Sequence, residues 1–160
     1  MAVFRYRLQN VLDIKFRMED QARAAFASAQ AKLNEEEAKR DALIEKMRAY
    51  EEEGRSLREN VLNVYNMRDN TRAIDNIKEQ IEEQEKNIRQ AAKVVDQARI
   101  RLTDAMQERK IHEKLKENSF EEFKREVNAA ESKEVDELVS YTYGERIKKN
   151  KLNQTNQESE

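Results

Sequence analysis

The chain has 160 residues and a formal net charge of −2; 40% of its residues are charged and only 38% are hydrophobic. It has no proline, cysteine or tryptophan and only two glycines, Gly54 and Gly144. Without cysteine it cannot form disulfides or thiolate metal sites, and its balanced charge gives no reason to expect nucleic acid as a partner. Proline and glycine are the strongest breakers of regular structure. The composition therefore predicts very long helices that bury a narrow apolar seam.

The first expected helix covers residues 4–64. Mostly apolar residues recur along it at alternating spacings of three and four, which is typical of a coiled-coil seam. Lys15, Glu19, Glu36, Arg40 and Gly54 interrupt this seam and are expected to weaken it. The apolar members are Leu8, Leu12, Ala22, Phe26, Ala29, Leu33, Leu43, Met47, Tyr50, Leu57, Val61 and Val64.

A polar segment, residues 65–71, is expected to form the turn, because Asn and Asp side chains satisfy turns and helix N-caps. The second expected helix covers residues 72–144. Its seam is apolar at every seventh residue up to Leu102, and its phase slips where Arg109 and His112 replace apolar residues. We therefore predict an all-α fold, an antiparallel coiled-coil hairpin over residues 1–149, followed by a disordered tail over residues 150–160.

The sequence offers little for catalysis. There is no Gly-rich phosphate loop, and His112 is the only histidine, so a metal site lacks converging ligands. The acidic runs have no apolar pocket to shift their pKa values. We predict no enzyme activity, no cofactor and no metal site. No apolar run is long enough for a signal peptide or a membrane span, and we expect a soluble intracellular protein.

Three segments go beyond a plain coiled coil. Residues 4–17 mix aromatic and basic side chains, which would either pack on the second helix or contact a partner or membrane. Leu43, Met47, Tyr50 and Tyr65 would either fill the core or form a docking surface, with Tyr50 and Tyr65 the most exposed. Residues 130–138 are either a solvated face or part of a surface beside the first turns of the first helix.

The opening of the chain resembles the start of the flagellar export protein FliJ family, in the pattern Phe4-Arg5-Tyr6-Arg7-Leu8-Gln9-x-Val11-Leu12-Asp13-x-Lys15. A second block, Lys133-Glu134-x-Asp136-Glu137 preceded by Glu131, is similar to an acidic patch near the C-terminus of that family. The expected arrangement of two long helices joined by a polar turn also resembles that of the family. Aromatic residues that family members often carry near the start of the second helix are missing, since Asn70, Ala73 and Ile74 stand there.

The resemblance implies a stalk of the flagellar type III export apparatus, cytoplasmic and peripheral at the inner face of the cell membrane. Its partners would be the hexameric export ATPase, the membrane export gate and export chaperones. The implied ATPase-binding residues are Arg5, Arg7, Lys15, Arg17, Lys133, Glu134, Asp136 and Glu137. The implied gate or chaperone contacts are Leu43, Met47, Tyr50 and Tyr65.

Two other functions remain open at this point. A generic coiled-coil scaffold, a chaperone-like binder or a peripheral stalk of a rotary ATPase would pair two copies of the chain through the interrupted seam. A membrane-surface protein would use the N-terminal segment, but Asp13, Glu19 and Asp20 balance its basic residues and predict weak binding to anionic lipid.

Overall fold

The computed structural model describes residues 3–157, with side chains up to residue 151. Within these residues the chain forms two helices and no strand: α1 (Gln9–Glu59) and α2 (Val64–Gln157). The chain divides into two compact units, Asp13–Lys110, here called the hairpin unit, and Met1–Leu12 with Ile111–Glu160, here called the terminal unit. The predicted all-α fold of two long packed helices is confirmed.

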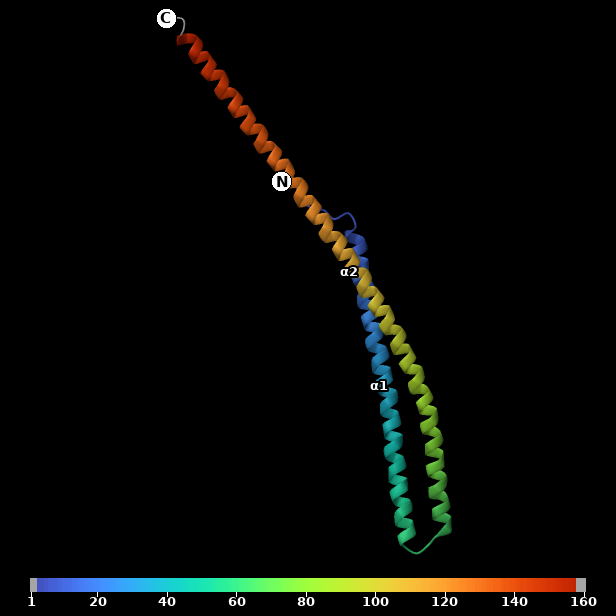
Figure 1. The fold of residues 1–160 in the computed structure, drawn as a ribbon. Coiled ribbons are helices and arrows are strands. Elements are labelled where there is room, and N and C mark those ends of the chain that lie inside the picture. Colours follow the sequence, from blue (N-terminus) through green and yellow to red (C-terminus); the bar gives the residue numbers. More distant parts are fainter. Residues whose placement is uncertain (1–2, 158–160) are drawn as a thin grey trace. The chain divides into compact units, whose positions relative to one another are not determined.

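In the hairpin unit α1 and α2 lie side by side and antiparallel (Figure 1). Contacts at the two ends of the unit establish the direction. Lys15 Nζ lies 2.6 Å from the Glu108 carboxylate, whereas Asn70 Nδ2 donates to the Tyr50 carbonyl at 2.8 Å. The early part of α1 therefore pairs with the later part of α2, as the sequence predicts.

The core is narrow, as a chain with so few apolar residues requires. Ala29, Val95 and Ala98 are buried together, and Phe26 and Leu33 pack against them. Small alanines let the two helix backbones approach, and the larger side chains fill the space beside them. The predicted seam is confirmed over this stretch of both helices.

The turn comes earlier than the sequence predicts. It consists of residues 60–63, because α1 ends at Glu59 and α2 begins at Val64. The predicted turn at residues 65–71 is wrong, since these residues belong to α2. The physical reason is an N-cap at Asn63, whose Oδ1 accepts the backbone N–H groups of Tyr65 at 3.1 Å and Asn66 at 3.3 Å.

Side chains also satisfy the last carbonyls of α1. Arg58 Nε donates to the Gly54 carbonyl at 2.9 Å, and Asn60 Nδ2 donates to the Ser56 carbonyl at 3.2 Å. The final carbonyls of a helix have no partner within the helix, so such contacts favour its end at this point. With both helix ends capped, a turn without glycine or proline is sufficient.

The outer helix boundaries also differ from the expected ones. α1 begins at Gln9 instead of residue 4, after a turn in which the Gln9 N–H donates to the Tyr6 carbonyl at 3.2 Å. α2 continues beyond residue 144 to Gln157, and Gly144 has helical backbone geometry without a positive φ. The predicted disordered tail, residues 150–160, lies partly outside the described residues and stays a prediction.

In the terminal unit the residues before α1 pack against α2. The Phe4 ring meets Phe120 edge-on with centroids 5.1 Å apart, and its centroid lies 5.5 Å from that of Phe123. Lys116 Nζ donates to Gln9 Oε1 at 2.7 Å. Edge-to-face aromatic pairs of this kind add about 0.5–1.5 kcal/mol beyond their buried area. They fasten a short non-helical segment to the side of α2.

Candidate functional surfaces

The N-terminal aromatic-basic segment separates by residue type. Phe4 and Tyr6 are half-buried, whereas Arg5 and Arg7 are exposed. The packing interpretation is therefore correct for the two aromatic residues, and the two arginines are available to a partner. Arg5 and Arg7 belong to the terminal unit.

Lys15 and Arg17 belong to the hairpin unit. Lys15 is half-buried and engaged with Glu108, whereas Arg17 is exposed. Of the two, Arg17 is the more accessible to a partner.

The acidic block near the C-terminus lies at the surface. Lys133, Glu134, Asp136 and Glu137 are exposed, as are all residues from 128 to 151. Packing of the N-terminal segment is recorded at Phe120 and Phe123, and Lys133 lies ten residues further along α2, about 15 Å away along its axis. The exposure of this block fits the first of its two interpretations, a solvated face.

This last part of α2 combines apolar and charged side chains. Residues 131–137 contain four acidic residues and one lysine, and residues 145–151 contain four basic residues and one acid. A shallow hollow is lined by Glu134, Glu137, Leu138 and Tyr141. Large apolar side chains on a helix with no packed neighbour are typical of a docking surface. Their exposed members are Val135, Leu138, Val139, Tyr141, Tyr143 and Ile147.

The central candidates divide between seam and surface. Leu43, Met47 and Tyr50 are half-buried along the seam. The expected exposure of Tyr65 is confirmed at 80%, but that of Tyr50 is wrong. Tyr50 lies where Asn70 reaches across from α2 to its carbonyl, so the helices are close there and cover much of its side chain.

The turn carries an apolar cluster, two members of which the sequence analysis placed in the seam. Val61 is 96% exposed, and Leu62, Val64 and Tyr65 are also exposed. Val61 and Val64 leave the seam because α1 ends before them. The available signal was the pair of asparagines, Asn60 and Asn63, that brackets two apolar residues. An apolar turn at the end of a helix pair is a second candidate docking surface.

Glu19 and Arg109 were expected to be faults in the seam, but they bind one another. Arg109 Nε donates to Glu19 Oε2, and Arg23 Nη2 donates to Glu19 Oε1 at 2.8 Å. The Arg109 guanidinium also lies over the Phe16 ring, 5.6 Å from its centroid. Burial acts to raise the pKa of Glu19, but the hydrogen bonds from Arg109 and Arg23 outweigh it and lower the pKa.

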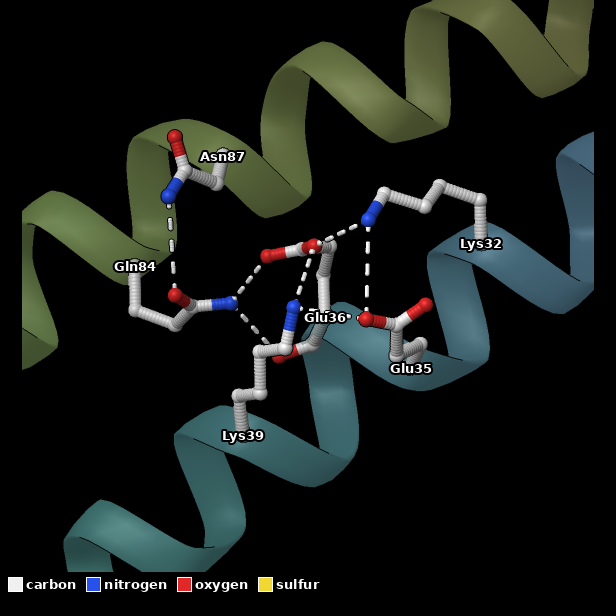
Figure 2. Close-up of polar contacts among 6 residues, drawn as sticks. All are labelled: Lys32, Glu35, Glu36, Lys39, Gln84 and Asn87. Atoms are coloured by element: carbon white, nitrogen blue, oxygen red, sulfur yellow. Dashed lines mark hydrogen bonds and ion pairs between the residues drawn. The ribbon is translucent and has the colours of Figure 1, made fainter.

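Glu36 lies in a second buried polar cluster (Figure 2). Gln84 Nε2 donates to Glu36 Oε2 at 2.6 Å and to the Glu36 carbonyl at 2.8 Å. Lys32 and Lys39 lie 3.0 and 3.1 Å from Glu36 Oε1. Hydrogen bonds from Gln84, Lys32 and Lys39 lower the pKa of Glu36 to about 2. The carboxylate is thus held ionised and fully hydrogen-bonded.

Groups suited to catalysis or metal binding do not gather in the described residues. No three His, Cys, Asp or Glu side chains converge there to hold a metal ion. The His112 ring is half-buried, and its Nδ1 is buried without a hydrogen-bond partner. The surfaces available to partners are therefore the last part of α2, the N-terminal arginines and the apolar turn.

The sequence matches the Flagellar FliJ protein family over residues 4–148. This chain belongs to the FliJ family. The match includes the whole of α1 and most of α2. The FliJ family is a non-catalytic component of flagellar export, and the chain described here is a helical member of it. The predicted family is confirmed.

Two further comparisons accompany this FliJ assignment. A solved structure from Chlamydia trachomatis, described as that of a YscO homolog, is similar at 24% identity. The similarity covers 88% of this chain and 96% of that chain, with a TM-score of 0.44. No curated protein matches this chain significantly. Neither of its helices, over the residues described, is long and apolar enough to cross a membrane.

Proposed function

We propose that this protein is the stalk of the flagellar type III export apparatus, a non-enzymatic coupling component. It binds the hexameric export ATPase and links it to the membrane export gate and to export chaperones. It lies in the cytoplasm, peripheral to the inner face of the cell membrane through these partners. The observation that carries the proposal is the stretch 128–151 of α2, which is exposed throughout and bears large apolar and charged side chains in a FliJ-family chain.

The ATPase contact is assigned to the terminal unit. Its accessible groups carry opposite charges: Arg5 and Arg7 precede α1, and Glu134, Asp136 and Glu137 lie on α2 with Lys133 among them. A ring of subunits that presents both charges toward its axis would select such a surface by electrostatic complementarity. Lys15 and Arg17, in the hairpin unit, are proposed as separate ATPase contacts, with Arg17 the more accessible.

The contact with the gate or chaperones is assigned to the hairpin unit. Tyr65 is more exposed than the other three proposed contact residues, and the apolar turn at Val61 and Leu62 adds to the surface. Tyr side chains are enriched in protein interfaces because they present a large apolar body with a polar tip. Leu43, Met47 and Tyr50 contribute their half-exposed edges along the same unit.

The test combines the purified protein with the export ATPase encoded in the same genome and follows ATP hydrolysis and co-elution. We expect faster hydrolysis and elution with a ring-sized species. Reversing Arg7 and Glu137 (Arg7→Glu with Glu137→Lys) should weaken both effects. A charge-matched control, Lys78→Glu with Glu82→Lys, reverses one exposed base and one exposed acid of the hairpin unit and should leave stimulation and co-elution unchanged.

Two outcomes would contradict the proposal. If the double reversal leaves stimulation and motility unchanged, the assignment of the ATPase-binding residues fails. If the folded protein neither binds nor stimulates the ATPase, the stalk function fails and a coiled-coil scaffold takes its place. A scaffold that pairs two copies would show twice the chain mass of 19.0 kDa in light scattering.

A further inference from the structure

Buried polar side chains in the hairpin unit share one property. The buried polar or charged residues of the described chain are Glu19, Glu36, Asn70 and Gln84. Each of them makes a contact to the other helix: Glu19 with Arg109, Glu36 with Gln84, and Asn70 with the Tyr50 carbonyl. Buried polar groups that served only local helix stability would not all cross between helices.

The apolar part of the seam does not select one alignment of the two helices. Along α2, Ile74, Ile81 and Ile88 repeat every seven residues, and the alternate positions are mostly apolar too. Sliding one helix by a heptad, about 10 Å, brings equivalent apolar residues back into contact. Apolar packing alone therefore leaves several alignments close in energy.

The sequence also contains a second possible turn. Residues 65–71 are rich in Asn and Asp, yet they lie inside α2. In an antiparallel pair, sliding by one heptad moves the turn by about three to four residues, and sliding by two moves it by about seven. Either slide would carry the turn from residues 60–63 into this polar segment. Competing alignments thus have a turn sequence available.

We propose that the buried polar contacts form a register lock, which holds α1 and α2 in one of these heptad-related alignments. Sliding toward the alternative turn would place Ala91 opposite Glu36 after one heptad and Ala98 after two. The buried carboxylate would then lose Gln84 and gain no replacement. Glu36 would keep Lys32 and Lys39 of its own helix, but the hydrogen bonds between its buried carboxylate and the buried Gln84 amide would be lost. Buried polar groups left without hydrogen bonds are unfavourable, so these alignments are rejected.

A close contact between Gly54 and Asn70, near the turn, also disfavours the alternative alignments. A Cβ atom on Gly54 would lie 2.6 Å from Asn70 Oδ1, so the Asn70 side chain occupies the space that glycine leaves. One heptad toward the alternative turn, Ile77 would take the position of Asn70 against Gly54. Its branched side chain cannot donate to the Tyr50 carbonyl. The lock therefore has contacts at residues 36 and 54 of α1, at two different heights of the hairpin unit.

The lock does not depend on the proposed export function. It fixes which residues of α1 and α2 lie at the same height in the hairpin unit, and so defines every surface made from both helices. A single buried polar residue specifies alignment in some coiled coils at a cost in stability. The buried pair Glu36–Gln84 would have this role here.

The test measures alignment directly in the full-length protein. The chain has no cysteine, so spin labels can be attached at Ala42→Cys and Lys78→Cys, two exposed positions of the hairpin unit. In the otherwise unchanged chain, pulsed electron paramagnetic resonance should give one narrow distribution of the distance between the two spin labels. With Glu36→Leu and Gln84→Leu added, a second distance should appear while circular dichroism shows a folded helical protein.

Two further variants separate alignment from general stability. Exchanging the pair, Glu36→Gln with Gln84→Glu, keeps a buried carboxylate–amide contact and should restore a single distance. The control Glu35→Leu with Glu83→Leu changes exposed glutamates next to the buried pair and should also keep a single distance. A single unshifted distance in the folded Glu36→Leu, Gln84→Leu variant would overturn the register lock. Loss of folding in that variant would overturn it too, because the pair would then serve stability and not alignment.

Discussion

Gln84 binds Glu36 at two points, its Nε2 donating to the carboxylate at 2.6 Å and to the backbone carbonyl at 2.8 Å. The same amide thus holds both a charged side chain and the main chain of the facing helix. Asn87 Nδ2 in turn donates to Gln84 Oε1 at 3.5 Å, which orients the amide (Figure 2). The pairing couples the ionisation of Glu36 to the packing of α1 on α2.

Acid should therefore weaken the hairpin unit through Glu36. Its pKa is about 2 in the folded protein, against an ordinary value of 4.5, so the folded state favours the ionised form. The stability this provides is complete above pH 4.5 and is lost as the pH falls toward 2. Glu36→Gln should lower the melting temperature at pH 7, with a much smaller difference at pH 2.5.

Circular dichroism melts at both pH values check this prediction. Glu83→Gln is the control, since Glu83 is exposed and its pair with Lys86 lies on the surface. It should change the melting temperature little at either pH. If the melting temperatures of Glu36→Gln and the unchanged protein differ by the same amount at pH 7 and pH 2.5, the ionisation of Glu36 does not contribute to acid unfolding.

The two glycines should respond oppositely to alanine. Alanine favours a helix by about 1 kcal/mol over glycine. At Gly144 a Cβ meets no atom within 4 Å, so Gly144→Ala should increase the helicity of α2. At Gly54 the Cβ would displace Asn70 from its contact with the Tyr50 carbonyl, and Gly54→Ala should lower the melting temperature.

Hydrogen exchange would locate both effects, with slower exchange around residue 144 and faster exchange around residues 50 and 70. The double variant Gly54→Ala with Asn70→Ala should regain part of the lost stability, because the clash is removed. A higher melting temperature for Gly54→Ala alone would show that Asn70 moves aside without cost.

Core truncation should be costly only on the buried face of α2. Ile77 is 3% exposed, and Ile77→Ala should lower the free energy of unfolding by about 2–5 kcal/mol. Ile100 is 61% exposed, and Ile100→Ala should change it by less than about 0.5 kcal/mol. Urea unfolding followed by circular dichroism measures both. Equal losses at the two positions would mean that α2 does not bury the face seen here.

Removing the N-cap of α2 should lower the stability of the protein. Asn63→Ala deletes the acceptor of the Tyr65 and Asn66 N–H groups and should cost about 0.5–2 kcal/mol. Asn63→Asp keeps the acceptor and should restore most of the stability. Asn76→Ala, at an exposed position inside α2, is the control and should have little effect. If Asn63→Ala is as stable as the control, the cap does not determine where α2 begins.

The apolar periodicity was sufficient to predict two long packed helices and much of their contact. Val95 and Ala98 lie in the core at their predicted spacing. The interruptions were harder to interpret, because a charged residue at a seam position has no partner in a one-dimensional pattern. Arg109 can bind Glu19, and Gln84 can bind Glu36, only when the two helices are aligned as they are in the structure.

The position of the turn was also difficult to predict from the sequence pattern alone. Residues 65–71 have better turn chemistry than Val61 and Leu62, and local preference alone favours them. The actual turn depends on contacts far from it in sequence, among them Gln84 with Glu36. For the functional surfaces, the exposure of Tyr65 was predictable from its position, whereas the half-burial of Tyr50 depends on Asn70 across the pair.

The short turn also sets an order of assembly for the hairpin unit. The separation in sequence between contacting residues grows with distance from the turn, from 20 for Tyr50 and Asn70 to 93 for Lys15 and Glu108. Closing the longer loop directly would cost about 1.4 kcal/mol more chain entropy than closing the shorter one. We therefore expect the helices to zip together from residues 60–63 outward. During synthesis, α1 is made before α2 and cannot pack until the facing part of α2 has been made. Its first residues contact the later part of α2, so they remain unpacked for the longest time.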